Sequence, residues 1–119
     1  MSTVMVVDDA QFMRMRVARS LSRHGYNVIE AKNGEEAVNT YTSLQPDVVV
    51  MDITMPVKDG LTALSEIRQY DPQAKVIMLT ALGQQAIILQ AIKAGAKDFV
   101  VKPCDINRLT RTLQEVLAS

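Results

Sequence analysis

Four short apolar runs in this chain each end in a polar residue that can take part in chemistry. Residues 4–7 are followed by two aspartates, and residues 48–51 are followed by Asp52. Residues 76–79 run into a threonine, and residues 99–101 run into a lysine. Such runs, separated by longer amphipathic segments, predict strands that are buried on both faces of a parallel sheet. Because the carboxyl ends of parallel strands meet at one edge of a sheet, we expect these polar residues to gather there.

The order of the predicted elements narrows the fold to one class. Strands are predicted at residues 3–7, 26–31, 47–51, 75–79 and 98–101. Helices are predicted at residues 11–24, 35–43, 60–70 and 84–94, with a last helix from the expected N-cap Asp105 to Leu117. Right-handed crossovers between parallel strands leave few topologies. We therefore expect one domain over residues 1–119, with a doubly wound, flavodoxin-like α/β fold of five parallel strands in the order 2-1-3-4-5 and five helices.

The first predicted helix has an apolar side. Its apolar residues fall on or near one face, namely Phe12, Met15, Ala18 and Leu21. Residues three or four apart lie on the same side of a helix, so this face is expected to be the one that packs inward.

Composition argues against several other classes of protein. Hydrophobic residues make up 48% of the chain, which argues against disorder. Thirteen basic and thirteen acidic residues give a formal net charge of zero, which does not suggest a nucleic-acid-binding surface. Neither a membrane-spanning run of roughly 20 apolar residues nor a signal peptide is evident. We therefore expect a cytoplasmic monomer that binds neither nucleic acid nor a membrane, and the single cysteine fits a reducing compartment.

Three carboxylates would meet at the predicted edge of the sheet, those of Asp8, Asp9 and Asp52. A like-charged pair about 4 Å apart costs on the order of 4 kcal/mol at an effective dielectric near 20, so either a pKa rises or a cation binds. Hard oxygen ligands with room for water suit Mg2+. Asp8 and Asp9 alone could equally be solvated turn residues, but Asp52 on the neighbouring strand favours a metal site.

Thr80 and Lys102 would add a hydroxyl donor and a cation to this site. Each is unremarkable by itself, because threonine favours strands and a lysine before proline is usually a solvated turn residue. Together they could hold an incoming phosphoryl group, since catalysis of phosphoryl transfer rests mainly on positioning and charge neutralisation. Asp52 could then attack phosphorus as a carboxylate nucleophile.

The chain resembles the response-regulator receiver domain over essentially its whole length. The matching segments are VVDD at residues 6–9, PDVVVMD at 46–52, MP at 55–56, DG at 59–60, LTA at 79–81, AGA at 94–96 and FVVKP at 99–103. Other segments resemble single-domain chemotaxis regulators of the CheY type, namely FMRM at 12–15, DITMP at 52–56, GQQA at 83–86 and AIKAGAKDF at 91–99. The chain also ends just after the last predicted helix, as a stand-alone switch would, and as a receiver domain cut from a larger regulator would.

The resemblance implies how the acidic residues act. Asp52 would accept a phosphoryl group from a sensor histidine kinase, with Mg2+ as the cofactor. Asp9 and Asp52 would bind Mg2+ directly, Asp8 would bind it through water, and Thr54 would bind it through its backbone carbonyl. Thr54 and Leu82 also stand at positions that influence dephosphorylation, and neither offers a carboxylate or amide to orient an attacking water.

The resemblance also implies how the phosphoryl group is held and how its presence is signalled. The phosphoryl oxygens would be bound by Thr80, Lys102 and the backbone amides of Ile53 and Ala81. Phe99 stands where the family carries its aromatic switch residue. The Lys102–Pro103 bond would be cis. The fourth helix, fifth strand and fifth helix would form the output surface, with a flagellar switch protein or another downstream target as partner and a phosphatase as a further one.

Two other functions remain open on these residues. A small phosphatase with an aspartate nucleophile would need a second acid two residues beyond Asp52, where this chain has Thr54. A flavodoxin-like electron carrier would need a Ser/Thr/Gly-rich phosphate loop after the first strand, where this chain has Asp8 and Asp9. The sequence therefore favours a signalling switch, which promotes its own phosphorylation and dephosphorylation, over an enzyme with turnover.

Overall fold

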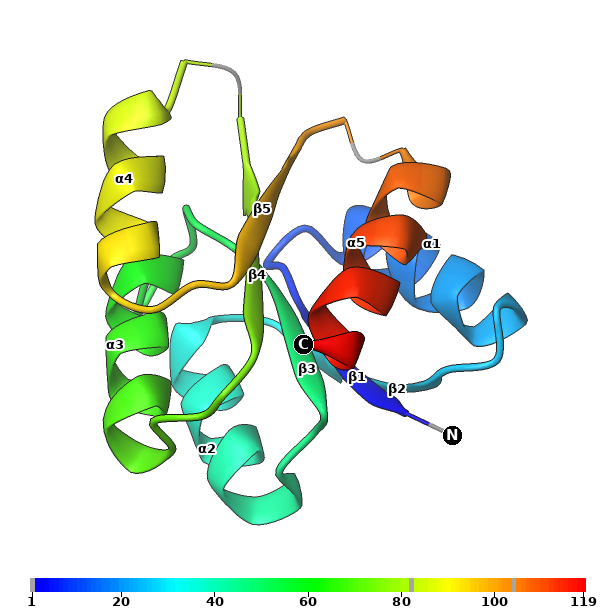
Figure 1. Cartoon of the computed structure of the whole chain (residues 1–119), viewed down its shortest axis with the longest axis horizontal. Helices are drawn as coiled ribbons and strands as arrows, with labels where there is room; N and C mark the ends of the chain where they lie inside the picture. Colours follow the sequence, from blue (N-terminus) through cyan, green and yellow to red (C-terminus); the bar gives the residue numbers. More distant parts are fainter. Residues whose placement is uncertain (1, 82, 104) are drawn as a thin grey trace.

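Strands and helices alternate along the whole chain in the computed structural model, which describes residues 2–81, 83–103 and 105–119 (Figure 1). The strands are β1 (Thr3–Val7), β2 (Asn27–Ala31), β3 (Val48–Asp52), β4 (Val76–Thr80) and β5 (Asp98–Val101). The helices are α1 (Gln11–Arg23), α2 (Gly34–Leu44), α3 (Gly60–Tyr70), α4 (Gln85–Lys93) and α5 (Ile106–Ala118). Each predicted boundary agrees to within one residue. Leu82, expected to influence dephosphorylation, lies outside the described residues.

The five strands form one parallel sheet in the order β2-β1-β3-β4-β5, which confirms the predicted order. Helices α1 and α5 cover one face of this sheet, and α2, α3 and α4 cover the other (Figure 1). The strands β1 and β3 lie side by side, with Val7 aligned with Met51. The residues that follow Val7 therefore reach the same edge as Asp52.

Alternate residues of the central strands belong to two separate cores. In β3, Val49 and Met51 pack with α2, α3 and α4, whereas Val48 and Val50 pack with α1 and α5. All four side chains are fully buried. Successive side chains of a strand point to opposite faces, so a strand covered on both sides needs an unbroken apolar run. The same alternation places the side chain of Asp52 on the face covered by α1 and α5.

Aspartate side chains cap the first turns of two helices, α3 and α5, near the carboxyl edge of the sheet. The carboxylate of Asp59 accepts a hydrogen bond from the Thr62 amide, 2.8 Å away, at the start of α3. The carboxylate of Asp105 accepts one from the Asn107 amide, 2.9 Å away, at the start of α5. Such caps satisfy amide groups that the helix itself leaves unpaired. The predicted N-cap Asp105 is thus confirmed.

Phe12 departs from the predicted inward face of α1. Ala18 and Leu21 are buried, but the Phe12 side chain is 73% exposed. Phe12 precedes Leu21 by nine residues, which is about two and a half helical turns, so the two side chains lie on opposite sides of α1. Successive steps of three residues drift around a helix, so the pattern that was taken as one face carried Phe12 away from the buried side.

Candidate functional site

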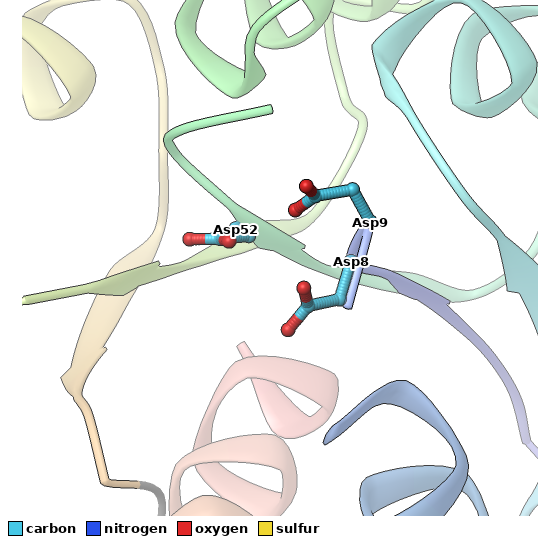
Figure 2. Close-up of side chains that lie close together, drawn as sticks. All are labelled: Asp8, Asp9 and Asp52. Atoms are coloured by element: carbon cyan, nitrogen blue, oxygen red, sulfur yellow. The ribbon is translucent and has the colours of Figure 1, made fainter. Parts of the chain in front are cut away.

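Three carboxylates meet at the carboxyl edge of β1 and β3 (Figure 2). One carboxylate oxygen from each of Asp8, Asp9 and Asp52 lies within 4.8 Å of the others. Asp8 is buried, Asp52 is half-buried and Asp9 is exposed. The convergence expected from the strand order is therefore present, and Asp9 borders the solvent.

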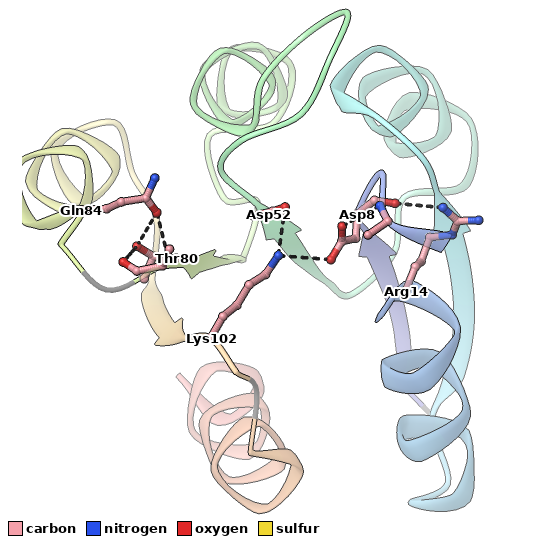
Figure 3. Close-up of polar contacts among 8 residues, drawn as sticks. Asp8, Arg14, Asp52, Thr80, Gln84 and Lys102 are labelled. Carbon is pink, nitrogen blue, oxygen red and sulfur yellow. Dashed lines mark hydrogen bonds and ion pairs between the residues drawn. The ribbon is translucent and has the colours of Figure 1, made fainter. Parts of the chain in front are cut away.

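Lys102 supplies a positive charge to this group. Its Nζ lies 3.0 Å from Asp52 Oδ2 and 3.3 Å from Asp8 Oδ2, between the two carboxylates (Figure 3). The backbone amide of Lys102 donates to the Thr80 carbonyl oxygen over 2.7 Å, which ties the end of β5 to the end of β4. The Lys102–Pro103 bond is cis, as the resemblance implies.

Burial and charge change the proton affinities of Asp52 and Lys102. Burial has the largest influence on Asp52 and raises the pKa of its carboxyl group above the usual value, although the hydrogen bond and charge of Lys102 offset part of this rise. Burial alone would lower the pKa of Lys102, but the hydrogen bond and charge of Asp52, with the charge of Asp8, raise it above the usual value. A cation bound among the carboxylates would favour their charged forms and so oppose the effect of burial.

The backbone around Asp8 is held by a residue whose role the sequence did not indicate. Arg14 Nη1 donates to the Asp8 carbonyl oxygen over 2.9 Å (Figure 3), and Arg14 Nε pairs with Glu30 over 3.0 Å. The Asp8 carboxylate itself accepts a hydrogen bond from the Ala10 amide over 2.9 Å. The only available signal was a basic residue in the first turns of the helix that follows the paired acids.

Thr80 and Ala81 make their polar contacts with Gln84 rather than with the carboxylates. The Thr80 hydroxyl lies 3.0 Å from Gln84 Oε1 and 3.1 Å from the Ala81 carbonyl oxygen (Figure 3). The Ala81 amide donates to the same Gln84 Oε1 over 2.7 Å. Thr80 is fully buried and Ala81 is exposed. Gln84 falls within the segment that resembles chemotaxis regulators, but no separate role was predicted for it.

Ile53 and Thr54 continue the chain beyond Asp52. The Ile53 amide, predicted to hold a phosphoryl oxygen, donates to the Leu79 carbonyl oxygen over 3.2 Å and so extends the pairing of β3 with β4. Its role toward a phosphoryl oxygen stays a prediction. Thr54 is exposed and borders a surface pocket with Met55 and Ile87.

Comparison with known proteins decides the family. The family described as response regulator receiver domain matches residues 4–114. The chain belongs to this family. The Chemotaxis protein CheY of Thermotoga maritima is 52% identical to this receiver domain over 114 residues, covering 95% of each chain. The Chemotaxis protein CheY of Bacillus subtilis is 50% identical over 115 residues, covering 96% of each.

Comparison with solved structures agrees with this assignment. A chain in the CheX-CheY-BeF3-Mg+2 complex from Borrelia burgdorferi superposes on this receiver domain with a TM-score of 0.92 and 38% identity, covering 97% of this chain and 88% of that chain. The protein is thus a CheY-like receiver domain of two-component signalling, a class of signalling switches rather than of classical enzymes. Across the described residues, every helix is too short or too polar to cross a bilayer.

The acidic cluster fits the cation that receiver domains bind. Receiver domains bind Mg2+ at an acidic site, and Asp8, Asp9 and Asp52 form such a site here. All three offer carboxylate oxygens, which are the hard ligands that Mg2+ prefers, and exposed Asp9 leaves room for bound water. The donor set is therefore suitable for this ion.

Phe99 lies on the same face of the sheet as Thr80 and borders the surface. In the sheet it is aligned with Met78, two residues before Thr80, so Phe99 and Thr80 lie on the same face. The Phe99 side chain is half-buried, packs against the core beneath α2, α3 and α4, and borders a surface pocket with Arg108 and Arg111 of α5.

Proposed function

We propose that this receiver domain is a phosphorylation-activated switch in which Asp52 accepts a phosphoryl group from a sensor histidine kinase. The position of the Asp52 carboxylate carries this proposal, because it lies beside two further acids and the Lys102 ammonium group. A carboxylate oxygen of Asp52 forms a bond to phosphorus as the P–N bond of the phosphohistidine breaks. The imidazole leaves with the electron pair, and Asp52 becomes an aspartyl phosphate.

The neighbours of Asp52 would neutralise and position the transferred group. Asp8, Asp9 and Asp52, with the Thr54 carbonyl, would hold Mg2+, which when bound supplies positive charge to the phosphoryl oxygens. Lys102 is already 3.0 Å from the Asp52 carboxylate, so its ammonium group needs little movement to meet a phosphoryl oxygen.

Labelling with a small phosphodonor tests this function. Incubation with acetyl phosphate and Mg2+ is expected to add the mass of one phosphoryl group, located on the peptide that contains Asp52 and labile to base and hydroxylamine. Chelation of Mg2+ should prevent the labelling. Labelling of a different residue would contradict the proposal, and continuous turnover of a generic phosphate ester would favour a phosphatase.

We further propose that the switch acts in the cytoplasm, in chemotaxis, on a flagellar switch protein. Relatives named as chemotaxis proteins match nearly the whole chain, which supports this role. The output surface would be formed by α4, β5 and α5, where Leu89 is 63% exposed and Ile92 is 43% exposed. A CheX-like protein would be a further partner, by analogy with the Borrelia burgdorferi complex. The alternative, a receiver domain from a larger regulator, would use the same site.

Mg2+ is expected to raise the melting temperature of the protein. A ligand that binds only the folded state stabilises it, by about 2.7 kcal/mol at a concentration 100 times its dissociation constant. Asp9→Ala should erase most of this increase, because it removes an exposed ligand without opening the core. Thermal unfolding with and without Mg2+ measures the effect, and Glu115→Ala on α5 is the control that should keep the full increase. An unchanged increase in Asp9→Ala would place the ion elsewhere.

Phe99→Ala is expected to weaken the response to phosphorylation while leaving Asp52 labelling nearly intact. Coupling between two sites is typically about 1–3 kcal/mol, so phosphorylation should improve target binding by roughly 5- to 150-fold in the parent protein. The variant should lose most of that gain. The measurement is the affinity for a flagellar switch peptide with and without beryllofluoride, a phosphoryl mimic. An equal gain in both proteins would leave Phe99 as a core residue only.

A further inference from the structure

A single side-chain oxygen occupies two donors that the proposed function assigns to the phosphoryl group. Gln84 Oε1 lies 2.7 Å from the Ala81 amide nitrogen and 3.0 Å from the Thr80 hydroxyl oxygen (Figure 3). Both groups were expected to bind phosphoryl oxygens. The Ala81 amide donates to Gln84, and the single proton of the Thr80 hydroxyl is shared between Gln84 Oε1 and the Ala81 carbonyl oxygen, so neither donor can serve an incoming oxygen fully.

The local backbone directs the Gln84 side chain toward these donors. Gly83 has φ +89°, in the left-handed region that favours glycine, and an added Cβ there would meet nothing within 4 Å. Glycine is therefore suited to this position by its conformation, which turns the chain so that the next residue folds back onto Ala81. The Gln84 carbonyl oxygen accepts the Ile88 amide over 3.0 Å, so the backbone of Gln84 begins α4 while its side chain serves the site.

We propose that Gln84 is a placeholder that occupies the position of a phosphoryl oxygen until Asp52 is phosphorylated. This inference rests on the proposed function. The carboxamide oxygen of Gln84 is a neutral acceptor, whereas a phosphoryl oxygen is charged and forms hydrogen bonds roughly twice as strong with the same donors. The phosphoryl group therefore displaces Gln84, and Gln84 reduces the affinity of the site for it.

Displacement of Gln84 would also connect the site to α4. Gln84 is the residue before α4, and its side chain makes no capping hydrogen bond to that helix. While Oε1 is held at β4, the first turn of α4 is tied to Thr80 and Ala81. Once it is released, that turn can adopt another position. Because α4 carries the exposed Leu89 and Ile92, the exchange of hydrogen-bond partners would change the proposed output surface.

Substitutions at Gln84 with opposite expected effects test the placeholder. Gln84→Ala removes the competing acceptor, and a net hydrogen bond is worth about 0.5–1.5 kcal/mol, so beryllofluoride with Mg2+ should bind roughly 3- to 10-fold more tightly. Gln84→Glu supplies a charged acceptor that holds the same donors more strongly, and binding should be weaker than in the parent. In the free protein, hydrogen exchange at the Ala81 amide should be faster in Gln84→Ala.

Substitutions at the neighbouring Gln85 show whether a change in beryllofluoride affinity is specific to Gln84 or is a general effect of charge or helix propensity. Gln85→Ala and Gln85→Glu make the same changes at the exposed first residue of α4, and they should leave beryllofluoride affinity close to that of the parent. In a Thr80→Val background, one of the two contested donors is gone. The gain in beryllofluoride affinity from Gln84→Ala should then be smaller than in the parent background, and a double-mutant cycle measures this difference.

Each result decides between the two proposals. A parent protein that binds no beryllofluoride in the presence of Mg2+ overturns both the phosphorylation site and the placeholder. A parent that binds it, together with a Gln84→Ala variant that binds equally or more weakly, overturns the placeholder alone. Weakening by Gln85→Glu equal to that by Gln84→Glu would also overturn it, because the effect would then be one of charge.

Discussion

Asp52→Asn is expected to reduce labelling by acetyl phosphate to background, while Lys102→Met slows it without abolishing it. Asparagine keeps the shape of the side chain but has no carboxylate to attack phosphorus. Lys102→Met keeps the nucleophile and removes a cation 3.0 Å from it. A hydrogen bond to a charged group is worth about 1.5–3 kcal/mol, which corresponds to a rate roughly 10- to 150-fold lower. The time course of phosphoryl incorporation, measured by mass spectrometry, separates the two effects.

The stability of Asp52→Asn shows whether its loss of labelling could result from unfolding. The folded-state pKa of Asp52 is raised above its usual value of 3.8, mainly by burial. The charged form of Asp52 therefore destabilises the fold at a pH above the raised pKa. This destabilisation disappears as the pH falls to the usual pKa of an aspartate. The neutral Asp52→Asn should be at least as stable as the parent at neutral pH, so lost labelling would not reflect unfolding. If Asp52→Asn labels as fast as the parent, the phosphoacceptor lies elsewhere.

The residues that the sequence predicted correctly are those fixed by topology. Strands buried on both faces need continuous apolar runs, and parallel pairing brings their carboxyl ends to one edge. Asp8, Asp9 and Asp52 therefore had to converge once the strand order was known. Lys102 follows the same rule, since it directly follows β5. These inferences needed only the order of the elements and no details of side-chain conformation.

The features that the sequence did not indicate depend on local backbone geometry. The contact of Gln84 with Thr80 requires the left-handed turn at Gly83, and no helical or strand periodicity describes a turn. The hydrogen bond from the Ile53 amide to the Leu79 carbonyl oxygen, which extends the pairing of β3 with β4 beyond Asp52, was likewise not indicated by the sequence. Phe12 was placed inward because steps of three residues were taken as one face, although over nine residues they drift half-way around the helix.

Gly60→Ala is expected to destabilise the protein by about 3 kcal/mol, in the upper range of the cost of forcing extra atoms into a packed core. Helix propensity alone predicts the opposite, because alanine in a helix interior is favoured over glycine by about 1 kcal/mol. Gly60 begins α3, and its amide donates to the Ile53 carbonyl oxygen over 2.7 Å. A Cβ at Gly60 would overlap the Asp52 carbonyl oxygen and lie 2.9 Å from the Ile53 Cα. Both are backbone atoms, so no side-chain rotation can relieve the contact.

The steric cost of Gly60→Ala falls on the backbone that positions the proposed nucleophile. Movement of the Asp52 carbonyl to admit a methyl group would disturb the end of β3, so acetyl phosphate labelling should slow even in the fraction of protein that remains folded. Thr62→Ala, an exposed change in the first turn of the same helix, is the control and should alter stability by less than about 0.5 kcal/mol. Urea denaturation measures both variants. A Gly60→Ala protein as stable as the parent would show that α3 can move away from β3, and the close packing of these two elements would then not be what holds Asp52 in place.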